Sequence, residues 1–234
     1  MTESVAEHSS LSVSVIIPVL NEAERIADVI ASTRAAGDCE VIVVDGDSDD
    51  GTVAAASTAD QVLQAHRGRA NQQNVGAQRA TGEVFLFLHA DCRLSAGAIG
   101  SMRAALRDVT VVGGCFRQRI DAPGLRYRWL ESGNALRVNV FKWAYGDQGI
   151  FVRRDVFEQV GGFPDLKLME DLFLVKSLKK RGRLVQLNDR LRVSARRWQR
   201  SGVVRQTARN WTLLALAQLG VSPNRLARFY PHVR

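Results

Sequence analysis

Three apolar segments of this sequence are each followed closely by a side chain that could bind a polar ligand. Val13–Val19 leads to Asn21, Val41–Val44 leads to Asp45, and Val84–Leu88 leads to Asp91. Segments of this length can form one buried strand and are too short to cross a membrane. In open α/β sheets, ligands bind at the carboxyl ends of the strands. The repeated pattern therefore predicts that the three polar ends share one binding site.

The second of these ends carries four acids, Asp45, Asp47, Asp49 and Asp50, within six residues. Like charges this close repel one another, so a plain turn has little need of them. An acid at a strand tip can accept hydrogen bonds from a base or a ribose hydroxyl. Such a cluster can also bind a divalent ion, although this one lacks the Gly and Glu positions of a calcium loop.

The third end reads His89, Ala90, Asp91. A carboxylate in this place can hold Mg²⁺ or Mn²⁺, which in turn bridges a diphosphate. Three alternatives stay open for His89, namely a second metal ligand, a hydrogen-bond donor to the ligand, or a core residue. A strand followed by an ordinary Asp turn is the interpretation without any ligand.

Two acidic or amide pairs lie later in the chain. Glu170 and Asp171 open a predicted helix, where acids compensate the helix dipole. A carboxylate there can instead take a proton from a hydroxyl, provided that it is ionised and within reach. Asp147 and Gln148 lie between two glycines and could hold a sugar or an acceptor, although a tight turn explains the glycines equally well.

A basic and aromatic cluster follows at residues 196–198. The adjacent guanidinium groups of Arg196 and Arg197 can clamp a diphosphate. Trp198 can stack on a sugar or pack against the rest of the protein. A solvated basic loop with Trp198 in the core is an equal alternative.

These residues need a scaffold, and apolar runs alternate with helical patterns in a way typical of a mostly parallel, doubly wound α/β sheet. The expected strands are Val13–Val19, Val41–Val44, Gln61–Ala65, Val84–Leu88, a more exposed Val111–Ile120, and Gly149–Val152. The expected helices are Glu22–Ala35, Gly51–Ala59, Ala70–Ala80, Ser95–Leu106, Leu125–Val140, Leu172–Lys180 and Val203–Leu219. Asn21 and Ser95 are the expected caps of the first and fourth helices.

Composition and length fit one α/β domain with a helical extension. The chain has 234 residues, of which 46% are hydrophobic. Its polar first residues predict a frayed tail rather than a signal peptide. Cys39, Cys92 and Cys115 are not spaced as a metal pair, so we expect reduced thiols in a cytoplasmic protein. The predicted division is a tail over 1–11, a domain over 12–199 and a basic helix and tail over 200–234.

Positive charge is concentrated at one end. The net charge is +8, yet residues 176–234 hold 15 Lys and Arg against the single acid Asp189. Such a segment can meet a nucleotide phosphate, a lipid head group or nucleic acid, or be a solvated surface. No recognised nucleic-acid motif is present, so we expect no nucleic-acid partner.

Taken together, the ordered motifs resemble the family 2 glycosyltransferases of the GT-A fold. The motifs are PVLNE, VIVVDGDSDDGT, RGRANQQNVGAQRATGE, HAD and MED, and the resemblance runs roughly from Val13 to Arg197. The segments LFLHAD and SARRW are similar to a small bacterial subgroup named radical-SAM/selenodomain-associated transferase 2. The resemblance implies a Rossmann-like, mostly parallel sheet flanked by helices, with a C-terminal basic helical extension.

The resemblance also implies roles by position. Residues expected to bind the nucleotide are Pro18, Asn21, Glu22, Asp45, Asp47, Arg69, Asn74 and Ala90. Asp91 keeps the metal position of the family's D-x-D motif, and His89 replaces its first acid and is a second candidate ligand. Asp171 is the expected general base, with Glu170 as a substrate binder or second base. Substrate and diphosphate contacts are expected from Asp147, Gln148, Arg196, Arg197 and Trp198.

The implied activity is sugar transfer, with inversion, from a nucleotide-diphosphate donor, typically a UDP-sugar, to a hydroxyl acceptor. Mn²⁺ or Mg²⁺ is the expected cofactor, and the acceptor is a small molecule or a lipid-linked one. Two alternatives are a nucleotide-sugar binding module without turnover and a nucleotidyltransferase. The segment PVLNEAER lacks the Gly-rich phosphate loop that a nucleotidyltransferase would want after its first strand.

The predicted helix Val203–Leu219 has two alternative fates. Residues 200–219 could lie on an anionic bilayer and bring the protein to the inner face of the membrane. The helix could equally pack on the sheet or on a second copy in a homodimer. Packing is the more common fate of an amphipathic helix, so we favour it.

Overall fold

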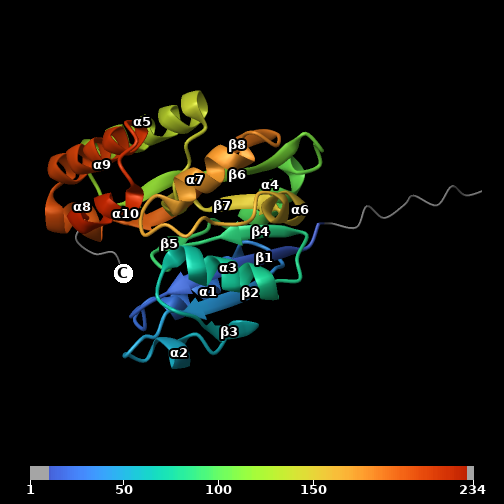
Figure 1. Ribbon diagram of the computed structural model, residues 1–234. Helices are drawn as coiled ribbons and strands as arrows, with labels where there is room; N and C mark the ends of the chain where they lie inside the picture. Colours follow the sequence, from blue (N-terminus) through green and yellow to red (C-terminus); the bar gives the residue numbers. More distant parts are fainter. Residues whose placement is uncertain (1–10, 231–234) are drawn as a thin grey trace, which may run out of the picture.

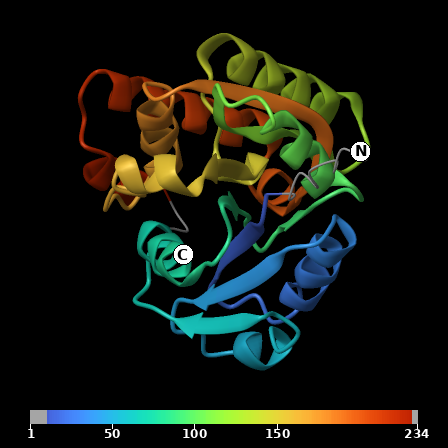
Figure 2. The ribbon, with the colours of Figure 1, turned by 90° about the vertical axis from the view of Figure 1, so that its right-hand side faces the viewer.

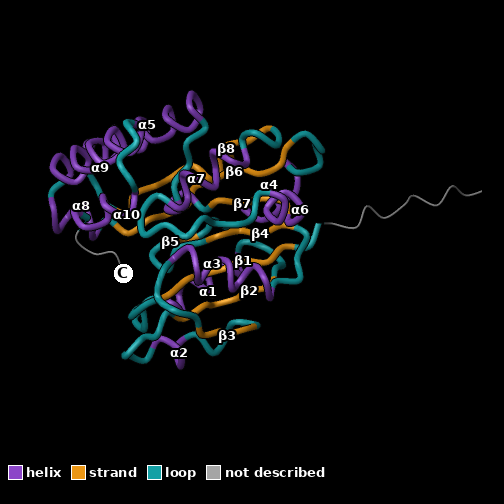
Figure 3. The backbone as a smooth tube through the Cα atoms, in the orientation of Figure 1, coloured by secondary structure: helices purple, strands orange, loops and turns teal. Residues whose placement is uncertain are grey.

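The computed structural model describes residues 11–230, and the side chains of Arg197 and Ser201 lie outside that description. An eight-stranded sheet runs through the molecule in the order β3-β2-β1-β4-β7-β6-β8-β5 (Figure 3). The expected tail over residues 1–11 therefore lies, apart from Leu11, outside the described residues. The fold is α/β, as predicted.

The N-terminal half of the sheet is parallel. Its strands are β1 (Val13–Val19), β2 (Glu40–Asp45), β3 (Gln61–Gln64) and β4 (Val84–Phe87), and β1 lies between β2 and β4. Strands β1, β2 and β4 are nearly continuous apolar runs because both faces of the sheet are covered there, whereas β3 lies at the sheet edge and is only partly buried. Their carboxyl ends lie at one edge of the sheet, as predicted for the three apolar segments. A binding site shared by Asn21, Asp45 and Asp91 stays a prediction.

Two layers of helices cover the two faces of the sheet. One layer holds α1 (Ile26–Ala35), α2 (Thr52–Ala55) and α4 (Ala98–Ala105), which pack on Val15 and Ile17. The other layer holds α3 (Arg69–Arg79), α6 (Arg154–Gln159) and α7 (Glu170–Leu178), which pack on Ile16 and Phe87. Alternate residues of each strand therefore enter opposite cores, as the pleat of a strand requires.

The second half of the sheet is mixed. Strand β7 (Ile150–Arg153) is antiparallel to β4 and to β6 (Val111–Asp121), and β6 is parallel to β8 (Arg183–Ser194). The two-residue β5 (Cys92–Arg93) pairs with β8 at the edge. The prediction that Val111–Ile120 is more exposed is wrong, because β6 lies between β7 and β8 and is mostly buried.

The C-terminal helices gather at one end of the molecule, far from β3 (Figures 1 and 2). They are α8 (Arg196–Ser201), α9 (Val203–Gln218), α10 (Pro223–Leu226) and the 3₁₀ turn η2 (Ala227–Phe229), with α5 (Leu125–Phe141) at the same end. The expected domain boundary after residue 199 falls inside α8. Within residues 11–230, no helix is long and apolar enough to cross a membrane.

Two predicted helix caps are wrong. Asn21 has a φ of 53° and lies five residues before α1, which begins only at Ile26. Ser95 also lies outside its helix, because α4 begins at Ala98 after the left-handed Gly97. The cysteines behave as expected, since all three are free thiols and Cys92 and Cys115 are buried.

Candidate functional site

An open cleft of about 650 Å³, its mouth included, lies between the sheet and the C-terminal helices. Four of the residues that line it were predicted from the sequence, namely Arg69, His89, Asp147 and Asp171. Six others were not, namely Tyr145, Leu168, Met169, Asn210, Leu213 and Tyr230. The structure thus joins predicted motifs from both halves of the chain with residues near its C-terminal end.

Asp171 lies in the first turn of α7, directly after Met169 and Glu170. Its carboxylate accepts hydrogen bonds from the backbone N–H of Gly146 (2.6 Å) and from that of Leu172 (2.7 Å). Burial, and then the neighbouring Glu170 charge, raise the pKa of Asp171 from 3.8 to about 6, although Arg69 and the two N–H donors act in the opposite direction. Asp171 is therefore a carboxylate poised near neutral pH, which suits a general base.

Glu170 has different surroundings from its neighbour. Its buried carboxylate forms an ion pair with Arg69 Nε at 3.1 Å. Arg69 is the first residue of α3, so this pair ties α7 to the helix that packs on β1 and β2. Of the two acids, Asp171 is the one that lines the cleft.

The loop around Gly146, whose N–H contacts Asp171, is held in place by side chains of α5. The buried Arg137 guanidinium donates to Gln148 Oε1 (3.0 Å) and to the Trp143 carbonyl (3.1 Å), and it stacks 3.9 Å from the centroid of the Tyr145 ring. Gln148 is 1% exposed and also accepts from the Tyr145 N–H. Gln148 therefore holds the loop instead of facing the cleft, contrary to the substrate contact expected for it.

Asp147 belongs to the same loop and lines the cleft. Its carboxylate accepts a hydrogen bond from Gln118 Nε2 at 2.9 Å, and Gln118 Oε1 accepts from Asn134 Nδ2 at 2.7 Å. Asn134 is on α5, so the same helix that fixes Gln148 also orients Asp147. A polar network thus prearranges this part of the cleft.

Gly146 allows a close approach between this loop and the HAD segment. A Cβ atom at position 146 would collide with Nε2 of His89 and would lie 3.4 Å from Asp171 Oδ2. His89 is buried beside the expected base, at the floor of the cleft. This placement is compatible with the ligand-contact alternative for His89 as well as with the core alternative.

The ends of β1 and β2 are tied together. The buried Asp45 carboxylate accepts from the backbone N–H of Asp47 (3.1 Å) and of Ser48 (3.0 Å). Asn21 donates its backbone N–H to Ser48 Oγ (2.9 Å) and accepts from the Asp49 N–H (3.0 Å). The cluster of acids is thus partly stabilised by its own turn.

Other predicted nucleotide residues have mainly structural surroundings. Pro18 lies inside β1, opposite Val44, and Ala90 is buried in the core. The Asn74 amide clamps the backbone of Phe163, donating to its carbonyl and accepting from its N–H, both at 2.9 Å. Asn74 therefore fixes the loop over residues 161–163, a contact that was not predicted from the sequence.

The SARRW segment reaches the end of β1. Arg196 lies 3.7 Å from the carboxylate of the buried Glu22, which also pairs with Arg25 at 3.1 Å. Trp198 packs in the main core with 8% of its surface exposed, so the packing alternative describes it and sugar stacking does not. The Arg197 side chain lies outside the described residues.

The metal expected at Asp91 would have few protein ligands. In the described part of the chain, no group of three or more His, Cys, Asp or Glu side chains converges on one point. Asp91 is partly exposed, with Cys92 Sγ 3.6 Å from its Oδ1. Mg²⁺ commonly uses one or two carboxylates together with substrate phosphates, so Asp91 fits a cation that arrives with a diphosphate.

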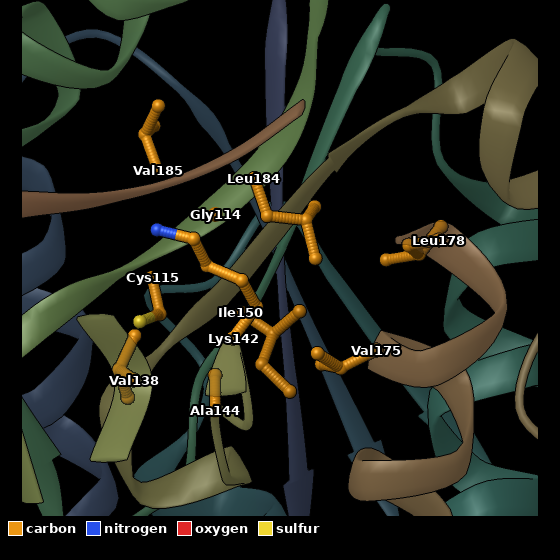
Figure 4. A pocket seen from close by; sticks show the side chains of 10 residues that line it. All are labelled: Gly114, Cys115, Val138, Lys142, Ala144, Ile150, Val175, Leu178, Leu184 and Val185. Atoms are coloured by element: carbon orange, nitrogen blue, oxygen red, sulfur yellow. The ribbon is translucent and has the colours of Figure 1, made fainter. Parts of the chain in front are cut away.

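A second cavity, between β6, β7 and α7, is apolar (Figure 4). Cys115 and Lys142 reach it among aliphatic side chains such as Ile150 and Val175. Burial raises the pKa of the Cys115 thiol to about 12, so the thiol stays protonated and unreactive. The chemistry of this chain is therefore expected in the first cleft.

The sheet order and the cleft at the carboxyl edge of its parallel strands define a GT-A-type α/β protein. The family model described as "Glycosyl transferase family 2" matches residues 14–161, which is more than half of the chain. The chain therefore belongs to glycosyl transferase family 2, as the sequence motifs predicted.

Individual relatives agree with this assignment. Glycosyltransferase AglE of Haloferax volcanii is 32% identical over 174 residues, which is 65% of this chain and 56% of AglE. The crystal structure of S. aureus TarS in complex with UDP-GlcNAc has a TM-score of 0.64 at 18% identity, covering 79% of this chain and 58% of that one. A TarS structure in complex with UDP has the same TM-score at 19% identity. This chain thus spans a little over half the length of these relatives.

Proposed function

We propose that this protein transfers a sugar from a nucleotide-diphosphate donor to a hydroxyl acceptor. The observation that carries the proposal is Asp171, a cleft-lining carboxylate whose pKa is raised to about 6 and which is held by the Gly146 N–H. Membership of glycosyl transferase family 2 supports the reaction class. A binding module would have no need of a base tuned to this range.

We infer that the donor is a UDP-sugar. The structurally similar TarS binds UDP-GlcNAc and UDP, and the two chains share their fold over 79% of this one. The ends of β1 and β2, where Asn21 and Asp45 lie, are the nucleoside side of the proposed site. Arg196, beside Glu22, would lie near the diphosphate.

In the proposed reaction, Asp171 takes the proton from the acceptor hydroxyl. The acceptor oxygen attacks the anomeric carbon from the face opposite the nucleotide, and the bond from that carbon to the phosphate oxygen breaks with inversion. The Arg69–Glu170 ion pair keeps Glu170 in place beside Asp171, where its negative charge helps raise the pKa of the base. Arg196 would offset charge that grows on the leaving diphosphate.

Asp91 would hold Mn²⁺ or Mg²⁺ when the diphosphate donor is bound. Such a cation supplies positive charge that stabilises the leaving nucleoside diphosphate. His89 is the alternative second ligand. The proposal does not require a metal centre built from protein side chains alone.

A thermal-shift screen of UDP, GDP, CDP and dTDP, each with and without Mn²⁺, tests the donor and the metal together. A ligand at 100 times its Kd stabilises the native state by about 2.7 kcal/mol, which is a rise of roughly 5–10 °C for a chain of this size. We expect this rise with UDP and Mn²⁺, and a smaller one for the same pair after Asp91→Ala. Shifts of equal size for all four nucleotides, independent of Mn²⁺, would contradict both assignments. A shift with UDP but no UDP release from any UDP-sugar would favour the binding module.

A further inference from the structure

One wall of the cleft, like Asp171 itself, lies outside the matched part of the family. Leu168 and Met169 precede α7, Asn210 and Leu213 are on α9, and Tyr230 follows η2. All five come after residue 161, where the family match ends. We call these five residues the C-terminal wall.

The C-terminal wall is held by its own small core. Leu168 and Leu213 are buried together with Leu226, and Met169 and Tyr230 pack against that cluster. The exposed side of the wall presents the Asn210 amide and the Tyr230 ring to the cleft. The wall is therefore a packed part of the fold, and its shape is set before any ligand binds.

The same wall is fastened to the segment that carries Asp171. The Lys167 N–H donates to Asn224 Oδ1 at 2.9 Å, and Lys176 Nζ donates to Gln218 Oε1 at 3.0 Å. Lys167 and Lys176 lie on either side of Asp171 in the chain. A molecule bound against the wall is thus positioned relative to the base.

We propose that the C-terminal wall is the acceptor subsite of the transferase, and that it takes an acceptor with an apolar ring face beside its reacting hydroxyl. This inference rests on the proposed function. A diphosphate needs cations or several N–H donors, whereas this wall contributes three aliphatic or thioether side chains, one amide and one phenol. Tyr230 lines the cleft with an aromatic ring, one face of which is covered by Arg209 at 5.0 Å from the centroid. Asn210, whose Oδ1 accepts from Gln206 Nε2 at 3.1 Å, can donate its amide N–H groups to a ligand.

The test uses the full chain and measures UDP release from UDP-glucose or UDP-GlcNAc, whichever the protein turns over. Two probes with the same sugar are compared, p-nitrophenyl β-D-glucoside and methyl β-D-glucoside. We expect the aryl glucoside to stimulate UDP release at a concentration at least fivefold lower than the methyl glucoside. Tyr230→Ala and Asn210→Ala should remove most of this difference, while Tyr230→Phe, which keeps the ring, should retain it.

The thermal shift with UDP should be retained in these variants, because the lining that Tyr230 and Asn210 belong to includes neither Asn21 nor Asp45, the residues proposed for the nucleoside. Equal responses to the two glucosides, or a Tyr230→Ala variant that still prefers the aryl probe, would overturn the acceptor subsite. Absence of UDP release from every donor, with or without a glucoside, would instead overturn the proposed function. The two failures are therefore distinguishable.

Discussion

Asp171 and Glu170 are adjacent acids with different partners, and this difference assigns their roles. Glu170 is paired with Arg69, whereas Asp171 faces the cleft and is held by backbone N–H groups. Folding raises the pKa of Asp171 from 3.8 to about 6, so the fold favours its protonated form. This contribution to stability is present below pH 3.8 and is lost as the pH rises through about 6. The ionised Asp171 that can act as a base at neutral pH therefore lowers the free energy of unfolding.

The raised pKa of Asp171 should set the pH dependence of sugar transfer. A base must be ionised, so transfer should rise with pH through about 6 and level off above it. Asp171→Asn should lower the rate by roughly 10²–10⁴-fold and should keep the thermal shift with UDP. Glu170→Gln removes a charge that raises the pKa of Asp171 and releases Arg69 from its pair, so its acid limb should move to lower pH.

UDP release measured from pH 4.5 to 9 checks both variants. An Asp171→Asn variant with the rate of the wild type would remove Asp171 as the base. An acid limb that moves upward in Glu170→Gln would contradict the electrostatic account of the raised pKa.

Strands and helices that depend on a local sequence pattern could be predicted from the sequence. Strands β1, β2 and β4 are buried on both faces, so they appear in the sequence as apolar runs. Strand β8 was missed because Arg183–Ser194 mixes charged and apolar residues, and its place between β6 and β5 comes from tertiary pairing. Asn210, Leu213 and Tyr230 were missed for a similar reason, since a helical pattern does not tell which cleft a helix will border.

The loop before β7 and the HAD segment meet closely at Gly146, where an added side chain should disturb both. Gly146→Ala places a methyl group against the His89 imidazole and beside Asp171, so the His89 side chain, the loop before β7 or both must shift. Overpacking of this kind costs about 1–3 kcal/mol of unfolding free energy, and the shift should also lower UDP release sharply because it moves the N–H that holds Asp171.

Gly133→Ala is the matched control, because Gly133 is inside α5 and an added Cβ there meets nothing within 4 Å. It should raise stability by about 0.5–1 kcal/mol and leave UDP release unchanged. Urea unfolding and UDP release, measured on both variants, check the pair. A Gly146→Ala variant as active and as stable as the Gly133→Ala one would show that the close approach to His89 is not needed.

At the scale of the whole molecule, charge and exposed apolar side chains coincide on α9. One side of this helix packs inward through Leu213 and Leu214, which agrees with the packing that the sequence favoured. The other side exposes Val204 (82%), Trp211 (54%) and Leu219 just beyond its end (81%). The helix has no acidic residue, and residues 176–234 hold 15 Lys and Arg against one acid, whereas the rest of the chain has more acidic than basic residues. Aromatic and cationic side chains on one surface suit an anionic bilayer.

We therefore expect the full chain to co-sediment with phosphatidylglycerol vesicles, to a lesser degree with phosphatidylcholine vesicles, and less as NaCl rises and screens the charges. Full burial of a large apolar side chain is worth roughly 1.5–3 kcal/mol, so Trp211→Ser should weaken vesicle binding by about tenfold. Val109→Ser is the control, because Val109 is equally accessible (83% exposed) but lies in the turn before β6 and outside the basic segment. Equal loss in both variants, or binding that ignores lipid charge, would show that α9 is only a solvated surface. A lipid-linked acceptor would then have no support from this surface, and a small diffusible acceptor would be favoured.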